Sequence, residues 1–145
     1  MITLELVTPE NYDEALALAV TDEQAHLIAP MVKSFADAFI WNAHPRVAVM
    51  DGRLVGFVMV FPFEVARAPV VNIVRFLIDA RFQGQGLGRR LMGATIDWVA
   101  TFDPRPSRIR ISTFPENQRA LGLYESVGFR QSGVEDGEAV LWRDC

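Results

Sequence analysis

The glycine-rich segment from Gln83 to Gly88 constrains the fold of this chain more than any other feature. It follows Val70 to Ile78, a run rich in β-branched residues, and precedes a segment whose apolar residues recur at helical spacing. Glycine allows a positive backbone φ and the close approach of a bulky group. The first amides of a helix have no intrahelical partner and lie at the positive end of its dipole. A strand, a glycine turn and a helix in this order therefore predict an anion site suited to a pyrophosphate.

Other glycine-rich phosphate sites do not fit this segment. The dinucleotide-binding pattern would need its third glycine where Arg89 stands, and the Gly-Lys-Ser/Thr of a P-loop is absent. A tight strand-to-helix turn without a ligand is the alternative that the turn alone leaves open.

Apolar spacing and turn residues predict the remaining elements. Strands are expected over 2–7, 46–50, 54–61, 70–78, 108–113, 129–132 and 139–142, and helices over 8–18, 31–39, 87–102 and 115–128. Thr8 and Pro9 mark the start of the first helix, and Asp51-Gly52 marks a hairpin. The order β-α-α-β-β-β-α-β-α-β-β predicts one mixed α+β domain, residues 1–145, around a central sheet.

Composition narrows the expected partners. Half of the residues are hydrophobic and the formal net charge is -4, so a basic nucleic-acid surface is not expected, whereas a cationic substrate suits the acidic balance. The longest apolar run, Leu54 to Phe63, is too short to span a bilayer. Cys145 is the one cysteine, which excludes an internal disulfide and Cys/His metal spacing. We therefore expect no nucleic-acid, membrane or metal partner. We also expect a cytoplasmic location, because the N-terminus lacks signal-peptide features, and the hydrophobic content permits a homodimer.

Gln83-x-x-Gly86-x-Gly88, preceded by Arg75 to Asp79, resembles the Gln/Arg-x-x-Gly-x-Gly/Ala signature of the GNAT acetyltransferases. The resemblance implies an acetyl-CoA site in which the backbone amides of the turn hold the pyrophosphate. It also implies that the strand over Phe76 to Ile78 splays from its neighbour and pairs with the pantetheine arm, as an added strand would. Arg89 is expected to contact a phosphate, whereas Arg90 is expected to face solvent. The implied fold is a twisted, mostly antiparallel sheet of six to seven strands flanked by about four helices.

A second segment, from Asn117 to Phe129, resembles the Asn-x-x-Ala-x-x-Leu-Tyr-x-x-x-Gly-Phe segment of the same family. On a helix, Asn117 and Tyr124 share one face with Ala120 or Leu121, because seven residues make about two turns. The resemblance implies that Asn117 contacts the coenzyme, that Ala120 permits its close approach, and that Tyr124 protonates the departing thiolate. A phenol, with a reference pKa of about 10, stays protonated at neutral pH and can donate to developing negative charge. A buried tyrosine with a satisfied hydroxyl is the alternative.

The implied reaction is direct attack of a neutral amine on the thioester carbonyl. A backbone amide of Phe76 to Ile78 is expected to polarise that carbonyl. An alkylammonium with a pKa of about 10 must first lose a proton, and Glu23, His26 and Glu64 are the candidate bases and acceptor-site residues. The residues assigned to acetyl-CoA by the resemblance are Phe76, Leu77, Ile78, Gln83, Gly84, Gln85, Gly86, Leu87, Gly88, Arg89, Asn117, Ala120 and Tyr124.

Finer similarity points to the spermine/spermidine branch of the family. The segments similar to that branch are Val20 to Gln24, Arg75 to Asp79, Tyr124 to Phe129 and Gly137-Glu138. Ala25 to Leu27 departs from it. Carboxylates would bind the ammonium groups of a polyamine; those available are Glu23, Glu135, Asp136 and Glu138. The alternatives are a protein N-terminus, a lysine or an aminoglycoside as the acceptor, or a CoA-binding module without activity.

Overall fold

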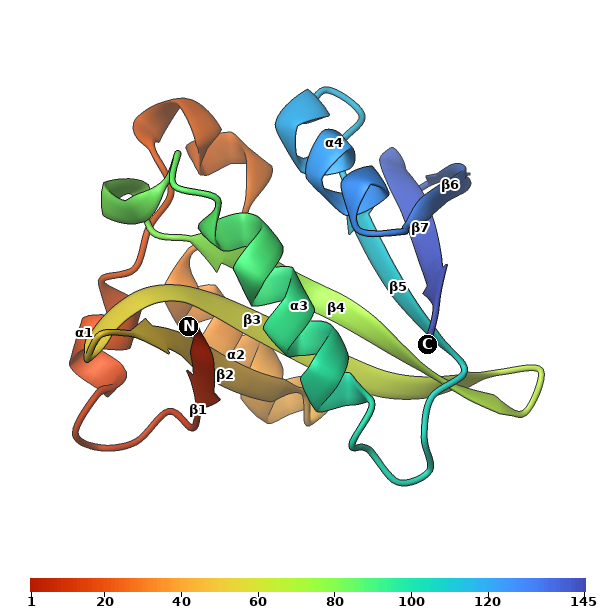
Figure 1. Cartoon of the computed structure of the whole chain (residues 1–145), viewed down its shortest axis with the longest axis horizontal. Coiled ribbons are helices and arrows are strands. Elements are labelled where there is room, and N and C mark those ends of the chain that lie inside the picture. Colours follow the sequence, from red (N-terminus) through yellow and green to blue (C-terminus); the bar gives the residue numbers. More distant parts are fainter.

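A seven-stranded sheet with the order β1-β2-β3-β4-β5-β7-β6 forms the centre of the computed structural model, which describes all residues from 1 to 145 (Figure 1). Every neighbouring pair of strands is antiparallel except β4 and β5, which are parallel. The predicted mostly antiparallel sheet, the four helices and their order are confirmed. The strands are β1 (Thr3–Glu5), β2 (His44–Met50), β3 (Arg53–Val65), β4 (Ala68–Ile78), β5 (Arg108–Thr113), β6 (Arg130–Glu135) and β7 (Glu138–Asp144). The helices are α1 (Tyr12–Leu16), α2 (Met31–Trp41), α3 (Leu87–Val99) and α4 (Gln118–Ser126), with two short 3₁₀ helices, η1 (Asp22–Leu27) and η2 (Ala80–Phe82).

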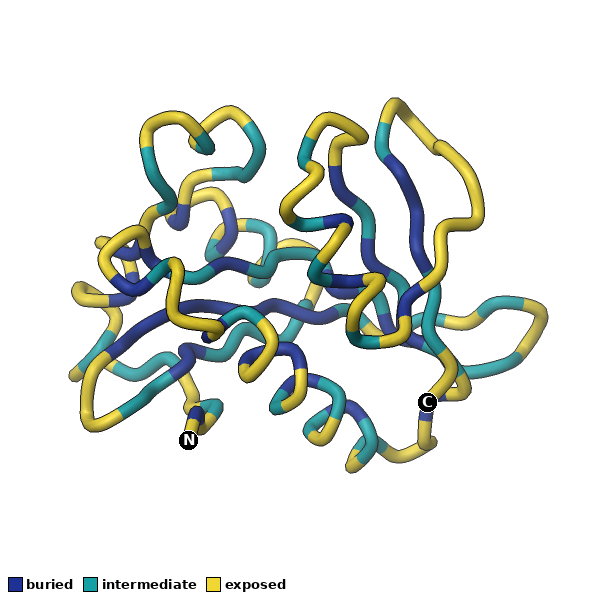
Figure 2. The backbone as a smooth tube through the Cα atoms, turned by 45° about the horizontal axis from the view of Figure 1, so that its top comes forward, coloured by how far each residue is buried: buried dark blue, intermediate teal, exposed yellow.

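Helices cover both faces of the sheet, and this explains the long apolar runs of its central strands. In Figure 1, α3 crosses in front of the sheet and α2 lies behind it. Leu91 of α3 and Tyr124 of α4 share one core with Val58 of β3, whereas Phe57 and Met59 of β3 belong to a second core with α1 and α2. A strand that is buried on both faces reads as continuously apolar. Burial is accordingly concentrated in the central strands, and the loops are exposed (Figure 2). None of the helices combines the length and the apolar character needed to cross a membrane.

The strands β4 and β5 separate about halfway along β4. Their parallel pairing ends with Ile73 opposite Ile111. At the same place the pairing of β4 with β3 shifts register, because Val74 is an extra residue on β4. Such a bulge bends its strand, and Figure 1 shows β4 and β5 running apart beyond the point where they meet. The bulge therefore opens the sheet in its middle.

The first helix begins later than the sequence predicted. Thr8 and Pro9 form a turn instead of a helix start, because the Thr8 N–H donates to Asn11 Oδ1 (2.8 Å) and the Thr8 carbonyl accepts from the N–H groups of Asn11 and Tyr12. α1 consequently starts at Tyr12 and has five residues. The 3₁₀ helix η1, which follows it, was not predicted.

Candidate active site

The opening between β4 and β5 is a cleft of about 860 Å³. Residues from η1, β4, the glycine turn, β5, α4 and the β6–β7 turn line it. Arg75 to Ile78 pair with β3 along one edge of β4, whereas no strand pairs with the other edge beyond Ile73. A strand edge of this kind carries free N–H and C=O groups. The cleft therefore offers backbone groups to an extended, amide-containing ligand.

The glycine turn that was predicted to bind an anion leads directly into α3. Gly84 and Gly86 have φ angles of +80° and +76°, in the left-handed region that favours glycine. Gly86 directly precedes α3, and no side chain caps the helix. The first amides of this 13-residue helix therefore keep their hydrogen-bonding capacity at the positive end of the dipole. The turn residues that line the cleft are Gln83, Gly84, Gly86, Leu87, Gly88 and Arg89.

The side chain of Gln83 links the turn to both rims of the cleft. Its Nε2 donates to the Ile78 carbonyl and to Gln24 Oε1 on η1, both at 3.0 Å. Its Oε1 accepts from Arg119 Nη1 on α4 at 3.4 Å. One carboxamide thus connects β4, η1 and α4 at the position where the turn begins.

Asp79 fixes the end of β4 just before the turn. Its carboxylate accepts from the N–H (3.0 Å) and Nε (2.8 Å) of Arg81 and from the N–H of Ala19 (3.1 Å). Burial alone would raise the pKa of Asp79, but these hydrogen bonds outweigh it and lower the pKa below its ordinary value. The charged carboxylate therefore holds the connection between α1 and η1 against the lead-in to the turn.

Asn117 determines where α4 begins beside β5. Its Oδ1 accepts from the Ala120 N–H (3.2 Å), as an N-cap does, and its Nδ2 donates to Thr113 Oγ1 (3.3 Å). Asn117 and Ala120 both line the cleft. The small side chain of Ala120 leaves space along the face of α4 that continues to Tyr124.

Tyr124 reaches the cleft from the same face of α4. Tyr124 is 6% exposed, and its ring packs edge-on against Phe76 of β4, with centroids 5.9 Å apart. The ring also contacts that of Phe129 at a tilt, with centroids 6.1 Å apart. Its hydroxyl forms no hydrogen bond within the protein and is not sealed in the core, since Tyr124 lines the cleft. Burial raises the pKa of the phenol far above its ordinary value. The hydroxyl is therefore a protonated donor with free hydrogen-bonding capacity.

The opposite end of the cleft, at the β6–β7 turn, is polar. Arg110 and Ser112 face it because β5 alternates polar and apolar residues. Arg110 Nη2 lies 3.6 Å from Glu135 Oε2, and Ser112 Oγ donates to Glu138 Oε1 (3.3 Å). Asp136, in the turn itself, also lines the cleft. Three carboxylates therefore gather at this end.

The sequence matches the Acetyltransferase (GNAT) family over residues 9–129. The chain belongs to the GNAT acetyltransferases. It is therefore an acetyl-CoA-dependent N-acetyltransferase, and enzymes of this family need no metal. No group of three or more His, Cys, Asp or Glu side chains is arranged to hold a metal ion.

Individual relatives show which proteins this GNAT enzyme is similar to. It is 33% identical over 150 residues to the spermine/spermidine N(1)-acetyltransferase of Bacillus subtilis (strain 168), across 99% of this chain and 98% of that protein. Its fold is similar to that of the aminoglycoside acetyltransferase AAC(6')-Ib in complex with coenzyme A, with a TM-score of 0.82, 21% identity, and 99% and 95% of the two chains covered. The ribosomal-protein-S18-alanine N-acetyltransferase of Escherichia coli has a TM-score of 0.72 at 20% identity, with 99% and 94% covered. At these identities the two structures share the fold with this chain, and they do not indicate its substrate.

The GNAT cleft brings together nearly all of the residues predicted for acetyl-CoA. Gln85 is the exception: it is exposed in the turn and does not line the cleft. Arg89 lines the cleft and donates to Ser126 Oγ (2.8 Å), and Arg90 is exposed. The predicted residues that line the cleft are Phe76, Leu77, Ile78, Gln83, Gly84, Gly86, Leu87, Gly88, Arg89, Asn117, Ala120 and Tyr124.

Two of the predicted acceptor-site residues lie outside the GNAT cleft. Glu64 is exposed near the tip of the β3–β4 hairpin, opposite Pro69, because both strands extend further than predicted. Glu23 is exposed on η1 but does not line the cleft. The structure therefore corrects the prediction for Glu64 and Glu23. His26 does line the cleft, and its Nε2 lies 3.6 Å from Glu116 Oε2.

Sequence reasoning missed two arginines of this site. Arg110 could have been found, because the alternation from Arg108 to Thr113 indicates a strand with one polar face. For Arg75 the sequence predicts only a place in the strand before the turn. Its orientation depends on the bulge at Val74, which no local signal in the apolar run indicates.

Proposed function

We propose that this GNAT acetyltransferase acetylates a primary amine of a small polycationic acceptor, such as spermidine or spermine. The observation that carries the proposal is the group of carboxylates at the β6–β7 end of the cleft, Glu135, Asp136 and Glu138. Arg110 offsets one of them. The local charge therefore favours a cation. The near full-length similarity to a spermine/spermidine acetyltransferase supports the same class of acceptor.

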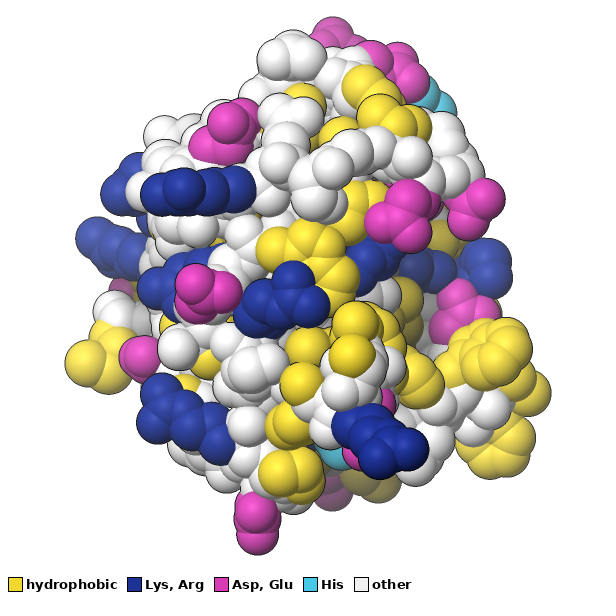
Figure 3. Space-filling view, turned by 90° about the vertical axis from the view of Figure 1, so that its right-hand side faces the viewer, with side chains coloured by type: hydrophobic (Ala, Val, Ile, Leu, Met, Phe, Trp, Pro, Cys, Tyr) yellow, Lys and Arg dark blue, Asp and Glu magenta, His cyan; other side chains and the backbone are white.

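The charges of the cleft, and not a general surface field, are the basis of this selectivity. Figure 3 shows acidic and basic side chains interspersed on one face of the molecule, with apolar side chains between them. Mixed charges of this kind largely cancel beyond a Debye length of about 8 Å at physiological ionic strength. An extended acceptor would instead place a distal ammonium against the carboxylates, while its reacting amine lies where β4 and β5 separate.

The other side of the cleft fits acetyl-CoA. The uncapped amides at the start of α3 would hold the pyrophosphate, and the free edge of β4 from Phe76 to Ile78 would pair with the pantetheine amides. Arg89 lies at the first turn of α3, where an anion offsets the unfavourable position of a cation. The face of α4 from Asn117 to Tyr124 would close this side, with Ala120 leaving room for the ligand.

The proposed transfer is a single displacement. The nitrogen lone pair of the neutral amine attacks the thioester carbonyl carbon, so that a C–N bond forms and the C–S bond breaks with its electron pair on sulfur. The nitrogen loses one proton to solvent and the sulfur finally gains one, giving an amide and a free thiol. A backbone N–H at the free edge of β4 stabilises the carbonyl oxygen while it carries negative charge.

Tyr124 assists the departure of the sulfur. Its hydroxyl has no other partner, and its ring is fixed against Phe76, on the strand that lines the thioester. Full proton transfer from a phenol with a raised pKa to a thiolate is unfavourable, because an ordinary thiol has a pKa of only about 8.5. The phenol therefore acts by donating a hydrogen bond to the developing thiolate, and the proton that stays on sulfur comes from solvent.

A panel of acceptors tests the proposed function. Thiol release from acetyl-CoA is measured with spermidine, spermine, kanamycin, a peptide with an N-terminal alanine and a peptide with an internal lysine. We expect kcat/KM for spermidine or spermine to exceed every other value by at least about tenfold, which corresponds to about 1.4 kcal/mol of preferential binding in the transition state. Acetylation of the peptides alone, or of kanamycin alone, contradicts the polyamine proposal.

Two further predictions accompany this proposal. A diffusible polyamine as the acceptor agrees with a cytoplasmic location, which cell fractionation checks. The hydrophobic content of the chain permits a homodimer, and sedimentation equilibrium measures whether one forms.

A further inference from the structure

Arg75 and Phe76 point to opposite faces of the sheet at the place where β4 leaves β5. The bulge at Val74 places both Val74 and Arg75 on the α2 face, where Val74 packs in the second core and Arg75 contacts Asp37 of α2. Phe76 lies on the other face and contacts Tyr124. The proposed function puts the sulfur on the side of Tyr124, and we place the acceptor amine on the opposite side of β4, with Arg75.

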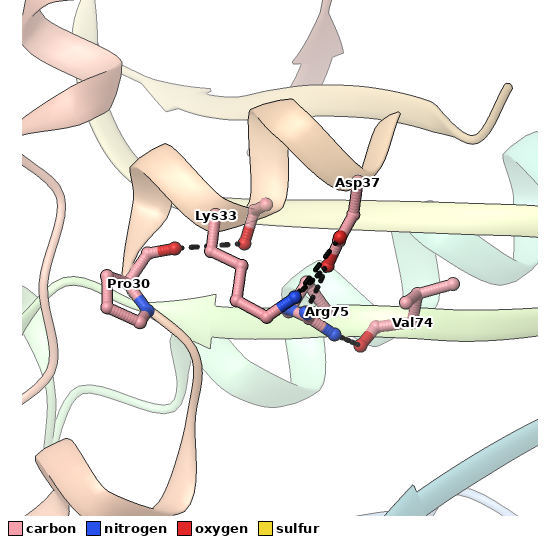
Figure 4. A network of polar contacts seen from close by, with 6 residues as sticks. Pro30, Lys33, Asp37, Val74 and Arg75 are labelled. Atoms are coloured by element: carbon pink, nitrogen blue, oxygen red, sulfur yellow. Dashed lines mark hydrogen bonds and ion pairs between the residues drawn. The ribbon is translucent and has the colours of Figure 1, made fainter. Parts of the chain in front are cut away.

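The guanidinium of Arg75 is held by a short ion pair (Figure 4). Its Nη2 lies 2.8 Å from Asp37 Oδ2, and its Nη1 donates to the Val74 carbonyl (2.9 Å). Lys33, one turn earlier on α2, also contacts the Asp37 carboxylate (3.1 Å). The side chains of Arg75 and Asp37 are 17% and 21% exposed, so water screens this pair incompletely.

The positive end of this pair faces the cleft. Arg75 lines the cleft, whereas Asp37 lines a smaller neighbouring cavity and not the cleft itself. The Nε of Arg75 is the one fully buried side-chain polar atom of the protein without a hydrogen-bond partner. That N–H is buried and does not reach the open cleft. Arg75 therefore brings a cation to the wall of the cleft, while the carboxylate that pairs with it lies outside the cleft.

We propose that Arg75 lowers the pKa of the acceptor ammonium bound beside it, so that more of the bound acceptor carries the lone pair needed for attack. A free alkylammonium has a pKa of about 10.4, and a neighbouring cation disfavours its charged form. The proton is released to water in the open cleft. This inference rests on the proposed amine acetylation and adds a division of roles. The β6–β7 carboxylates hold the distal ammonium, and Arg75 favours loss of the proton from the reacting ammonium to water.

Other charged groups near Arg75 also influence the pKa of the bound acceptor ammonium. On α2 these are Asp37 and Lys33, and the remaining groups that line the cleft on the acceptor side are His26 of η1, Arg110 of β5, and Glu135, Asp136 and Glu138 of the β6–β7 turn. All but the substituted residue are present in every variant below. The comparison between variants therefore isolates the effect of the Arg75–Asp37 pair.

Single-turnover rates of acetyl transfer against pH test the inference, measured from about pH 6 to about pH 10 with both substrates saturating and with the acceptor that the panel selects. The acid limb of the pH–rate profile is the low-pH side, where the rate rises as the bound ammonium loses its proton. In Arg75→Gln we expect this limb to move up by about one pH unit. The rate should therefore fall about tenfold at pH values below the pKa of the bound ammonium and recover at high pH. Arg75→Lys, which keeps the charge, should retain the wild-type limb. Asp37→Asn, which removes the opposing charge, should move the limb to lower pH.

Arg67→Gln provides the matched control, because it removes the same charge from the exposed turn of the β3–β4 hairpin, outside the cleft. Its profile should match the wild type. An active Arg75→Gln enzyme whose rate falls by one factor at every pH, or an acid limb that does not move in either Arg75→Gln or Asp37→Asn, overturns the inference while leaving the acetyltransferase proposal intact. Absence of transfer to every amine overturns that proposal instead.

Discussion

The two walls of the cleft differ in the groups that form them and in how far those groups are buried. The donor wall, formed by the turn 83–89, the free edge of β4 and the cleft face of α4, consists of backbone groups and buried side chains such as Leu87 and Tyr124. The acceptor wall, formed by η1 and the β6–β7 turn, is exposed: η1 has no buried residue, and every residue of β6 is exposed. The donor wall is therefore fixed by the core, whereas side chains on the acceptor wall can change at little cost to folding.

This difference separates the chemistry that every acetyl transfer shares from the choice of amine. Backbone amides are present whatever the side chains, so a turn that depends on φ and helix position holds the same diphosphate in different sequences. Exposed carboxylates act through charge alone, and substitutions of exposed residues away from caps or strained positions usually change stability by less than about 0.5 kcal/mol. We therefore expect substitutions in the donor wall to abolish activity and substitutions in the acceptor wall to shift specificity.

Gly86→Val should have the largest effect. A β-branched residue at φ +76° is strained, so the turn must move and the first amides of α3 lose their alignment with the pyrophosphate. Loss of about two hydrogen bonds to a charged group weakens acetyl-CoA binding by roughly 100-fold, measured by titration calorimetry. Gly93→Ala, in the interior of the same helix with open space around its Cβ, is the control and should bind acetyl-CoA normally. Equal binding by the Gly86→Val variant would show that the turn does not hold the coenzyme.

Tyr124→Phe should reduce the rate of acetyl transfer by about 100-fold, as the loss of one donor to a developing anion does elsewhere. Acetyl-CoA affinity and the unfolding midpoint should change little, because the hydroxyl has no partner in the folded protein. Single-turnover kinetics and thermal unfolding measure the two quantities. An unchanged transfer rate would show that the Tyr124 hydroxyl takes no part in the reaction and that Tyr124 only packs in the donor wall.

Glu138→Gln should raise the KM for a polyamine by about five- to tenfold and leave the KM for acetyl-CoA unchanged, because it removes one charge from the acceptor wall only. The hydrogen bond from Ser112 can be kept by the glutamine oxygen. Glu64→Gln, outside the cleft, is the matched control. A rise in both KM values would indicate a structural effect and not an ammonium contact.

Gly122→Ala should have the smallest effect on activity. Gly122 lies on the face of α4 that points away from the cleft. The added methyl group meets no atom within 4 Å, and alanine is more favourable than glycine in a helix interior by about 1 kcal/mol. The unfolding free energy should rise by up to that amount, with kcat unchanged. A loss of acetyl-CoA binding would show that the donor wall extends around α4.

The sequence predicted the donor wall better than the acceptor wall, for the same physical reason that distinguishes them. The turn at Gly86 and the cap at Asn117 are local structures, specified by residues within a few positions of one another. The order of strands and helices followed from apolar spacing and turn residues. Thr8 failed as a helix start because the Asn11 side chain bonds back to its N–H, a competing local turn that the apolar pattern does not reveal.

The acceptor side of the cleft depends on contacts between distant segments. Arg75 and Asp37 are 38 residues apart and meet only because the bulge at Val74 reverses the direction of Arg75. Glu64 lies near the tip of the β3–β4 hairpin, because the two strands pair further than their apolar runs indicate. Carboxylates on exposed turns carry no periodic signal, so their distance from a cleft cannot be predicted from local sequence.

Backbone amide shifts measured by NMR during titration with acetyl-CoA test the central claim most directly. The account predicts the largest shifts at Gly86 to Arg89 and at Phe76 to Ile78, where the amides meet the diphosphate and the pantetheine arm. Saturable binding whose shifts lie elsewhere, with these two segments unchanged, would contradict the assignment of the cleft.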